Sequence, residues 1–274
     1  MVLSSEYFFR RLEAHNREKL QKHLFSYFDE VQCICYIRHP ADRYLSHSLQ
    51  KVRHSGKIPQ PPKNTFRPVI ESYSSWVPVA VRPYHNDLLI RGDIIADFVQ
   101  TFLCGLSYDE FAQSGSRDNT ALPAEVASIL QDYRHTVHPS DDDIIYPEDT
   151  HLAKTLSGIA CEKGLERKAE LKPSARQFIA QRAQEELEWL HDTYGIRFPR
   201  NDDHTDKEEK SPQKQLKAAH LCDICEIDEK IEKQLLIHTI AEQARRIIED
   251  EQLIAQLRRG PAIRFLLSIK HQRS

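Results

Sequence analysis

A short apolar segment near the amino end constrains the fold more than any other part of the chain. Residues 31–37, Val-Gln-Cys-Ile-Cys-Tyr-Ile, are rich in β-branched and aromatic side chains, and His39-Pro40 ends the run. Such a run is typical of a strand buried on both faces in a parallel sheet. Pro40 then suits the first turn of a helix, and the helix dipole favours the charge of Asp42 there. The pattern predicts a strand, a tight turn and a helix in immediate succession.

Other segments extend this alternation of strands and helices. Their apolar spacing predicts helices over residues 6–29, 93–103 and 173–194 and a second strand over residues 76–84. Asp93 is a start signal for one of these helices, and Gly195 is a stop signal for another. The alternation predicts an α/β fold, with a parallel sheet flanked by helices and ligands at the carboxyl ends of the strands.

The carboxyl-terminal part of the sequence predicts a separate helical extension. Residues 199–218 form an expected linker, because the stretch up to Gln215 has almost no apolar side chains. Within residues 219–274, isoleucines and leucines at helical spacing predict a long amphipathic helix. Its apolar face needs a partner, either the preceding domain or a second copy of the chain. We therefore expect an α/β domain at 1–198, a linker and a helical extension.

Composition excludes several classes of protein. The chain has 274 residues, of which 40% are hydrophobic and 29% charged, as in soluble globular proteins. Its 38 Lys and Arg residues against 41 Asp and Glu give a net charge of -3, without the basic excess of a nucleic-acid-binding protein. The sequence has neither a long apolar span nor the basic and apolar regions of a secretion signal. The scattered cysteines predict reduced thiols, so we expect a cytoplasmic protein without nucleic-acid or membrane partners.

The candidate binding site consists of an arginine followed eight residues later by a serine. Arg38 ends the first predicted strand, and Ser46 falls one to two turns into the helix that follows. This placement lets a guanidinium group and a hydroxyl group converge on one phosphate. Each charge-assisted hydrogen bond would contribute about 1.5–3 kcal/mol. The residues alone leave a second interpretation open, in which Arg38 pairs with a nearby carboxylate such as Asp42.

The sequence around these two residues resembles a known motif. Tyr36-Ile-Arg-His-Pro-Ala-Asp-Arg-Tyr-Leu-Ser46 is similar to the 3′-phosphate-binding motif of sulfotransferases that use 3′-phosphoadenylyl sulfate (PAPS). The segment Ser4-Ser-Glu-Tyr-Phe8 resembles a glutamate-containing segment that precedes this strand in carbohydrate sulfotransferases and their bacterial relatives. Residues 84–103 resemble the family's later strand and the helix after it. The resemblance covers residues 1–198 and is strongest around Arg38.

The resemblance implies a P-loop NTPase-like α/β fold and a defined reaction. Arg38 and Ser46 would bind the 3′-phosphate of PAPS, the sulfuryl donor. Glu6 would be the general base that takes the proton from a hydroxyl of a carbohydrate-type acceptor during sulfuryl transfer. No metal ion is implied. The residues alone offer another interpretation of Glu6, a first-turn glutamate favoured by the helix dipole, with Ser4 or Ser5 as the cap.

The chain departs from the family pattern at the loop that binds the 5′-phosphosulfate. That loop, of the Lys-x-Gly-Thr-Thr type, offers backbone N–H groups and a lysine to the donor. None of the 8 glycines of this chain lies in such a sequence. We expect the missing strand and loop to lie upstream of Met1, lost through a misplaced start or a shortened gene. If they are absent, the protein is a degenerate, sulfotransferase-like binding or assembly module without catalysis.

A nucleotide kinase is a third interpretation, because kinases of this kind share the P-loop fold. Fold alone does not determine function. A phosphate-binding loop of the G-x-x-x-x-G-K type does not occur in the sequence. The sequence therefore argues against this interpretation.

Two charged runs leave further alternatives open. Lys51, Arg53, Lys57 and Lys63, with aromatic residues nearby, would suit an anionic or saccharide acceptor. Such a run is more often a solvated loop. The acidic run Asp141-Asp142-Asp143 lacks the ligand spacing of a calcium loop, and we expect it to be a charge run in a loop or at a helix start.

The segment His220-Leu-Cys222-Asp-Ile-Cys225 has the spacing of half a zinc site. Two thiolates at this spacing can share a tetrahedral ion, to which the histidine would add a ligand. Structural zinc sites need four ligands, and the sequence has no second C-x-x-C pair. We therefore expect ordinary thiols and no metal.

Overall fold

The computed structural model of the protein describes most of the chain. The described residues are 1–5, 8–63, 66–103, 105–110, 121–199, 216 and 218–259. The chain forms two compact units: a first unit of Met1–Gln50, Ile58–Ala121 and Glu170–Cys225, and a second unit of Lys51–Lys57, Leu122–Ala169 and Glu226–Ser274. Most of the expected linker lies outside the described residues, so the domain boundaries at 198 and 218 stay a prediction.

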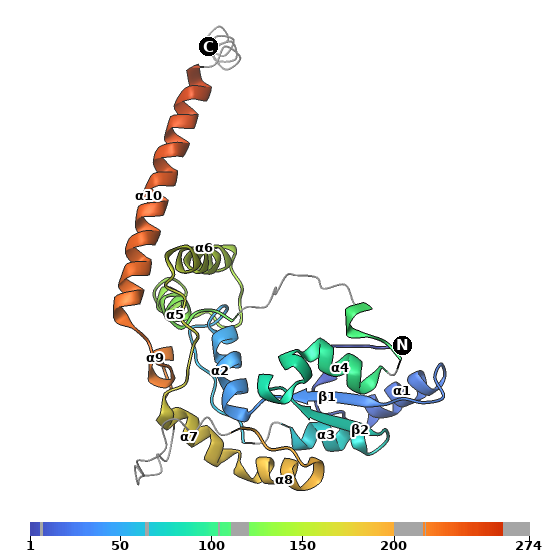
Figure 1. Ribbon diagram of the computed structural model, residues 1–274. Helices are drawn as coiled ribbons and strands as arrows, with labels where there is room; N and C mark the ends of the chain where they lie inside the picture. Colours follow the sequence, from blue (N-terminus) through green and yellow to red (C-terminus); the bar gives the residue numbers. More distant parts are fainter. Residues whose placement is uncertain are drawn as a thin grey trace. The chain divides into compact units, whose positions relative to one another are not determined.

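The fold is mixed α/β and mostly helical (Figure 1), which confirms the predicted class at this coarse level. The first unit contains α1 (Ala14–Phe25), β1 (Cys33–Ile37), α2 (Pro40–Lys51), α3 (Arg67–Ser74), β2 (Val79–Pro83), α4 (Ile94–Phe102), α7 (Pro173–Arg182), α8 (Gln184–Tyr194) and α9 (Leu221–Ile224). The second unit contains α5 (Ala124–Val137), α6 (Pro147–Lys163) and α10 (Glu229–Arg259).

The sheet of the described residues consists of β1 and β2, which pair in parallel. Both strands fall inside the ranges predicted for them. The register places Cys33 beside Val79 and Ile37 beside Pro83. Pro83 occupies the last position of β2, where a missing N–H interrupts the ladder least. The next residue, Tyr84, donates its N–H to the Ile37 carbonyl at 2.6 Å, so the two strands end side by side.

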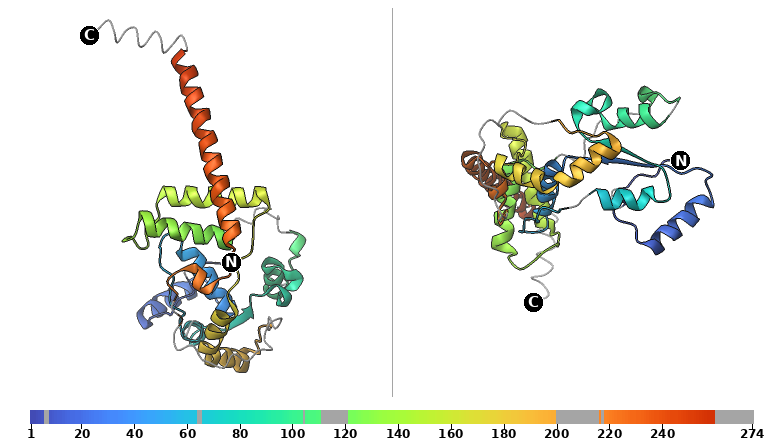
Figure 2. Two further views of the ribbon diagram at one scale, coloured as in Figure 1. Left: turned by 90° about the vertical axis from the view of Figure 1, so that its left-hand side faces the viewer. Right: turned by 90° about the horizontal axis from the view of Figure 1, so that it is seen from below.

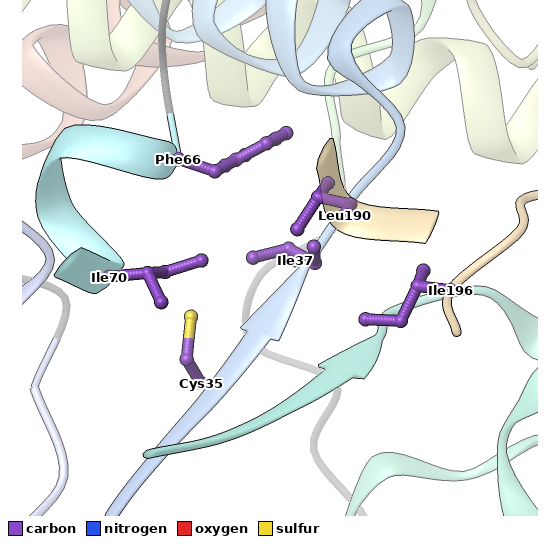
Figure 3. Close-up of a cluster of buried hydrophobic side chains, with 6 residues drawn as sticks. All are labelled: Cys35, Ile37, Phe66, Ile70, Leu190 and Ile196. Carbon is purple, nitrogen blue, oxygen red and sulfur yellow. The ribbon is translucent and has the colours of Figure 1, made fainter. Parts of the chain in front are cut away.

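An apolar core lies on one face of this strand pair. Figure 3 shows the six buried side chains that form it: Cys35 and Ile37 from β1, Phe66 and Ile70 at α3, Leu190 from α8, and Ile196. Each fully buried Ile, Leu or Phe side chain contributes about 1.5–3 kcal/mol. Successive residues of a strand point to opposite faces. The intervening residue Tyr36 therefore points away from this core, and its hydroxyl donates to Asp97 of α4.

The first helix is shorter than predicted. α1 covers only the middle of the expected range 6–29, and none of its residues is buried. Hydrogen bonds to α3 occupy the backbone before it. The Tyr73 hydroxyl donates to the Phe8 carbonyl at 2.6 Å, and the Leu12 N–H donates to the Ser72 hydroxyl at 3.2 Å. These backbone groups are satisfied outside a helix, so the helix starts later.

The single helix predicted over residues 173–194 is two helices. α7 and α8 are separated at Ala183, which has φ -99° and ψ 8°. Three residues after this break, the buried carboxylate of Glu186 lies at the start of α3. There it accepts the N–H groups of Phe66 and Arg67, the latter at 2.9 Å. Gly195, with φ 69°, ends α8 in the left-handed conformation, as the sequence predicts.

The second unit contains two helices that the sequence analysis did not assign. Eight consecutive residues of α5, Ala124–Gln131, are buried, so the first two turns of this helix lack the polar face that marks an amphipathic helix. Arg134 of α5 forms an ion pair with Asp149 of α6, and both side chains are buried. Glu125 is also buried and lies 3.0 Å from Arg167.

The long helix predicted near the carboxyl end is α10, of 31 residues. Its beginning packs on α5 and α6, where Leu235 is fully buried. Its later turns extend beyond these two helices (Figures 1 and 2). Neither α10 nor any other helix in the described part of the chain combines the length and apolar character that crossing a membrane requires.

Candidate functional site

The candidate site lies at the carboxyl ends of β1 and β2. Arg38 directly follows β1, and Tyr84 and His85 directly follow β2. Because the strands are parallel, these residues leave the sheet at the same edge, which is where ligands usually bind in α/β proteins. α2 begins two residues after Arg38, at Pro40, so a helix amino terminus lies in the same turn.

Arg38 is exposed to solvent and rests on an aromatic ring. Its guanidinium carbon lies 4.3 Å from the centre of the Tyr84 ring. A cation–π contact of this kind contributes about 0.5–1 kcal/mol at an exposed position. No described carboxylate forms an ion pair with Arg38. No N–H group of Arg38 donates to another described residue, so among the described residues nothing competes with an anion from solvent for these donors.

Asp42 pairs with Arg176 of α7 instead of with Arg38. The Arg176 Nη2 donates to the Asp42 Oδ1 at 2.6 Å. The alternative interpretation, in which Asp42 neutralises Arg38, therefore does not describe this structure. Both partners of the pair are about one-third exposed, so the pair contributes little to stability, about 0–1 kcal/mol. Its main effect is to connect the first turn of α2 to α7.

His39 caps α2 from within the same turn. Its Nδ1 accepts the Ala41 N–H at 3.2 Å, which satisfies one of the unpaired donors at the start of the helix. Burial lowers the pKa of the His39 ring, and Asp42 opposes this shift. The charges of Arg176 and His85 lower the pKa further. A neutral ring with Nδ1 as an acceptor orders the start of α2 and adds no positive charge to the edge.

The structure shows no contact between Arg38 and Ser46, the second predicted residue of the phosphate site. Ser46 lies in α2, half-buried, and its hydroxyl has no hydrogen bond to another described residue. The convergence of Ser46 and Arg38 on one phosphate therefore stays a prediction. Glu6 lies outside the described residues, so its role as a general base also stays a prediction.

A buried aspartate of α4 connects this helix to both strands, near their carboxyl ends. The Asp97 carboxylate accepts the Tyr36 hydroxyl at 2.7 Å, the Arg82 Nε and Nη2 at 2.6 Å each, and the Ile90 N–H at 3.1 Å. Burial alone would raise the pKa of Asp97, but these hydrogen bonds hold it below its ordinary value. Tyr36 and Arg82 each stand two residues before the edge, so the network fixes the direction in which Arg38 and Tyr84 leave the sheet.

The sequence analysis missed this network and two contacts of the edge. It did not predict Tyr84 as the support of Arg38 or Arg176 as the partner of Asp42. One signal was present for the network. Arg82 interrupts an apolar strand and Asp97 interrupts an apolar helix turn, and a charged residue in a buried element needs a partner of opposite charge.

Two basic residues at and after the end of α2 are partly neutralised within the second unit. Lys51 pairs with Asp143 and lies 3.2 Å from Asp142, and Lys57 lies 3.3 Å from Asp142. Hydrogen bonds from Ser55 and then Lys51 lower the pKa of Asp142. The acidic run is therefore part of a charged loop, as expected. Because these two lysines have carboxylate partners, an anionic acceptor would have to compete with Asp142 and Asp143 for them.

Cys222 and Cys225 lie at the short helix α9. Cys222 is exposed, whereas Cys225 is buried and forms a β-bridge with Leu171. In the part of the chain that the structure describes, no three His, Cys, Asp or Glu side chains are grouped so that they could hold a metal ion. We assign no metal site to the described residues.

Comparisons with known proteins add no assignment. No protein-family model, no curated protein and no solved structure matches the chain. Any functional inference must therefore come from the residues themselves and from the geometry of the strand edge.

Proposed function

We propose that this protein is related to PAPS-dependent sulfotransferases and binds the 3′-phosphate of PAPS with Arg38 and Ser46, on a P-loop NTPase-like α/β fold. In this proposal it transfers the sulfuryl group to a hydroxyl of a carbohydrate-type acceptor. The observation that most supports it is the placement of Arg38. This arginine is exposed at the carboxyl end of β1, stacked on Tyr84, and without an ion pair among the described residues.

The described residues suit one end of the donor. The planar guanidinium of Arg38 matches two phosphate oxygens, and the nearby amino terminus of α2 adds the positive end of a helix dipole. For the 5′-phosphosulfate, the sequence of this chain contains no loop of the Lys-x-Gly-Thr-Thr type. The support from the described residues is therefore limited to the 3′-phosphate.

The proposal gives the site residues different tasks. Bound PAPS would supply an activated sulfuryl group. Glu6 would accept the proton of the acceptor hydroxyl, which requires a carboxylate within hydrogen-bond reach of that oxygen. Arg38 and Ser46 would hold the nucleotide at its 3′-phosphate, away from the reacting sulfur. Substitutions at Arg38 and Ser46 should therefore weaken nucleotide binding, whereas Glu6→Gln should leave binding intact and abolish transfer.

A thermal-shift experiment tests the proposed binding site. Saturating 3′-phosphoadenosine 5′-phosphate should raise the melting temperature, because a ligand at 100 times its Kd stabilises the folded state by about 2.7 kcal/mol. Adenosine 5′-phosphate, which lacks the 3′-phosphate, should give little shift. Arg38→Ala should abolish the difference between the two nucleotides. Arg182→Ala, an exposed arginine at the end of α7, is the matched control and should preserve it. An unchanged shift with Arg38→Ala would remove Arg38 from the site.

A second candidate function is binding or assembly without catalysis. It is favoured by the absence of the family's glycine loop from this sequence. An assay for sulfuryl transfer to carbohydrate hydroxyls separates the two candidates. Transfer that Glu6→Gln abolishes supports the enzyme, whereas nucleotide binding without any transfer supports the binding module.

A further inference from the structure

The later turns of α10 carry an exposed apolar row. Ile240, Ile247 and Ile254 recur at intervals of seven residues and are exposed by 68%, 58% and 49%. Three further apolar side chains beside this row are exposed by 44–55%: Leu236, Ile237 and Ile248. A repeat of seven residues is the spacing at which two helices pack along their whole length. Exposed apolar side chains that share one face of a helix mark an interaction surface.

The described remainder of the second unit does not cover this row. Every residue from Ala244 to Ala255 is exposed, whichever side of the helix it occupies. Figures 1 and 2 agree that these turns extend beyond α5 and α6. Helical turns without tertiary contacts gain little stability in water. Both the apolar row and the helix itself would therefore gain from a partner.

The charges on these turns favour a second copy of α10 in antiparallel orientation. Arg245 and Arg246 precede Ile247, and the acidic run Glu249–Glu251 follows Ile248. A twofold axis between Ile247 and Ile248 places Arg245 of each copy opposite Asp250 of the other, beside the apolar face. Within one copy, Arg245 and Arg246 also pair with Glu242, at 3.0 and 3.1 Å. Parallel helices in register would instead place like charges opposite each other, which is unfavourable.

The same axis also pairs large with small side chains. Ile240 of one copy falls across from Ala255 of the second, and Ile254 falls across from Ala241. Ile247 meets Ile248 at the centre. Alternation of large and small residues lets two helices approach closely and interdigitate. Shape and charge therefore select the same register.

We propose that α10 is a self-association surface, which pairs with α10 of a second copy in antiparallel orientation about an axis between Ile247 and Ile248. Such an interface uses the same patch on both copies, so it closes after two subunits. The proposal does not depend on PAPS binding or on sulfuryl transfer. The expected assembly is a dimer.

Sedimentation velocity of the full-length protein at micromolar concentrations tests this assembly. The expected species has twice the 31.9 kDa of one chain. Ile247→Asp, in the middle of the row, should raise the dimer Kd at least tenfold. Leu253→Asp is the matched control, because Leu253 is equally exposed, at 54%, but lies off the row. A wild-type monomer at all concentrations, or an equal loss in both variants, would overturn the proposal.

Charge reversal tests the orientation of the two helices. Arg245→Glu should weaken the dimer, and adding Asp250→Arg to the same chain should restore it. No effect of the first variant would mean parallel helices and would overturn the antiparallel register.

Removal of residues 260–274 tests whether this segment, and not a second copy of α10, covers the apolar row. A chain that ends at Arg259 should still dimerise. If the full chain is monomeric and only the shortened chain dimerises, residues 260–274 cover the row, and the proposal is wrong.

Discussion

The guanidinium of Arg38 stacks on the ring of Tyr84, and this contact joins the residues that follow the two parallel strands. The Tyr84 backbone is fixed by its hydrogen bond to the Ile37 carbonyl. The ring is therefore a support that is tied to the sheet, and it restricts a long arginine side chain that is otherwise surrounded by solvent. Restricting this side chain beforehand reduces the entropy lost when an anion binds.

This contact predicts different effects of two substitutions at Tyr84. Tyr84→Leu should raise the Kd for 3′-phosphoadenosine 5′-phosphate about two- to fivefold, because a cation–π contact at an exposed position is worth about 0.5–1 kcal/mol. Tyr84→Phe keeps the ring face and should bind as the wild type does. Isothermal titration calorimetry measures both constants. Equal weakening in both variants would mean that the hydroxyl, and not the ring, supports binding.

Asp97→Asn should destabilise the first unit by about 2–4 kcal/mol, because Arg82 loses its buried carboxylate partner. Urea unfolding measures this loss. Asp87→Asn is the control: Asp87 is exposed, and its only observed ion-pair partner in the described residues is His85, at 3.8 Å. The control should unfold at the same urea concentration as the wild type. Equal stability of Asp97→Asn and the wild type would show that the network is dispensable.

The same network predicts a pH dependence. The pKa of Asp97 in the folded protein is below its ordinary value, so its carboxylate stabilises the fold above the unfolded pKa of about 3.9. This contribution is lost as the pH falls through the folded value. The difference in unfolding free energy between the wild type and Asp97→Asn should therefore be full near neutral pH and shrink below about pH 4. A difference that stays constant at low pH would contradict this assignment.

Removing one partner of the ion pair between Arg134 and Asp149 should destabilise the fold, whereas replacing both partners by apolar residues should be tolerated. Asp149→Ala leaves a buried guanidinium without its partner and should cost about 3–5 kcal/mol. Arg134→Met/Asp149→Leu removes both charges and should recover most of that loss. Chemical denaturation of the single and double variants measures the difference. A double variant as unstable as the single one would mean that the charges are needed to form the second unit.

Glu232, on the first turns of α10, should weaken the fold when it is ionised. Burial raises its pKa, a hydrogen bond from Ser128 opposes this, and the charges of Asp132, Glu125 and Glu229 raise it further. The protonated form of Glu232 therefore stabilises the fold relative to the ionised form. This contribution is present below the unfolded pKa and is lost as the pH rises through the folded pKa. Glu232→Gln should raise the melting temperature near neutral pH, because the amide carries no charge to be buried, and differential scanning calorimetry measures this change. No gain, or a loss, would contradict this sign.

Local signals in the sequence were sufficient for the two strands and for some of the helix ends. β1 is an apolar β-branched run, Pro40 and Asp93 mark helix starts, and Gly195 ends α8. The break at Ala183 carries no local signal in the sequence, such as a glycine or a proline. α5 was missed for another reason: its first two turns are buried on all sides and include charged residues whose partners lie on other segments.

The candidate site was predictable only in part. The position of Arg38 follows from one strand and one turn, which are local features. Its stacking on Tyr84 and the pairing of Asp42 with Arg176 join residues that are far apart in the sequence, so the register of the sheet and the packing of α7 had to be known first. The role of Ser46 remains a prediction, since its hydroxyl has no observed partner among the described residues.

The ladder between β1 and β2 has a consequence for folding kinetics. Each residue pair of the ladder, such as Cys33 and Val79, joins positions that are separated in sequence by the whole of α2 and α3. Closing such a loop costs entropy before any strand hydrogen bond forms, so non-local pairing slows folding. We expect the strands to pair late, after α3 and α8 have begun to form the core. The edge that carries Arg38 should then be among the last parts to become protected from hydrogen exchange during refolding.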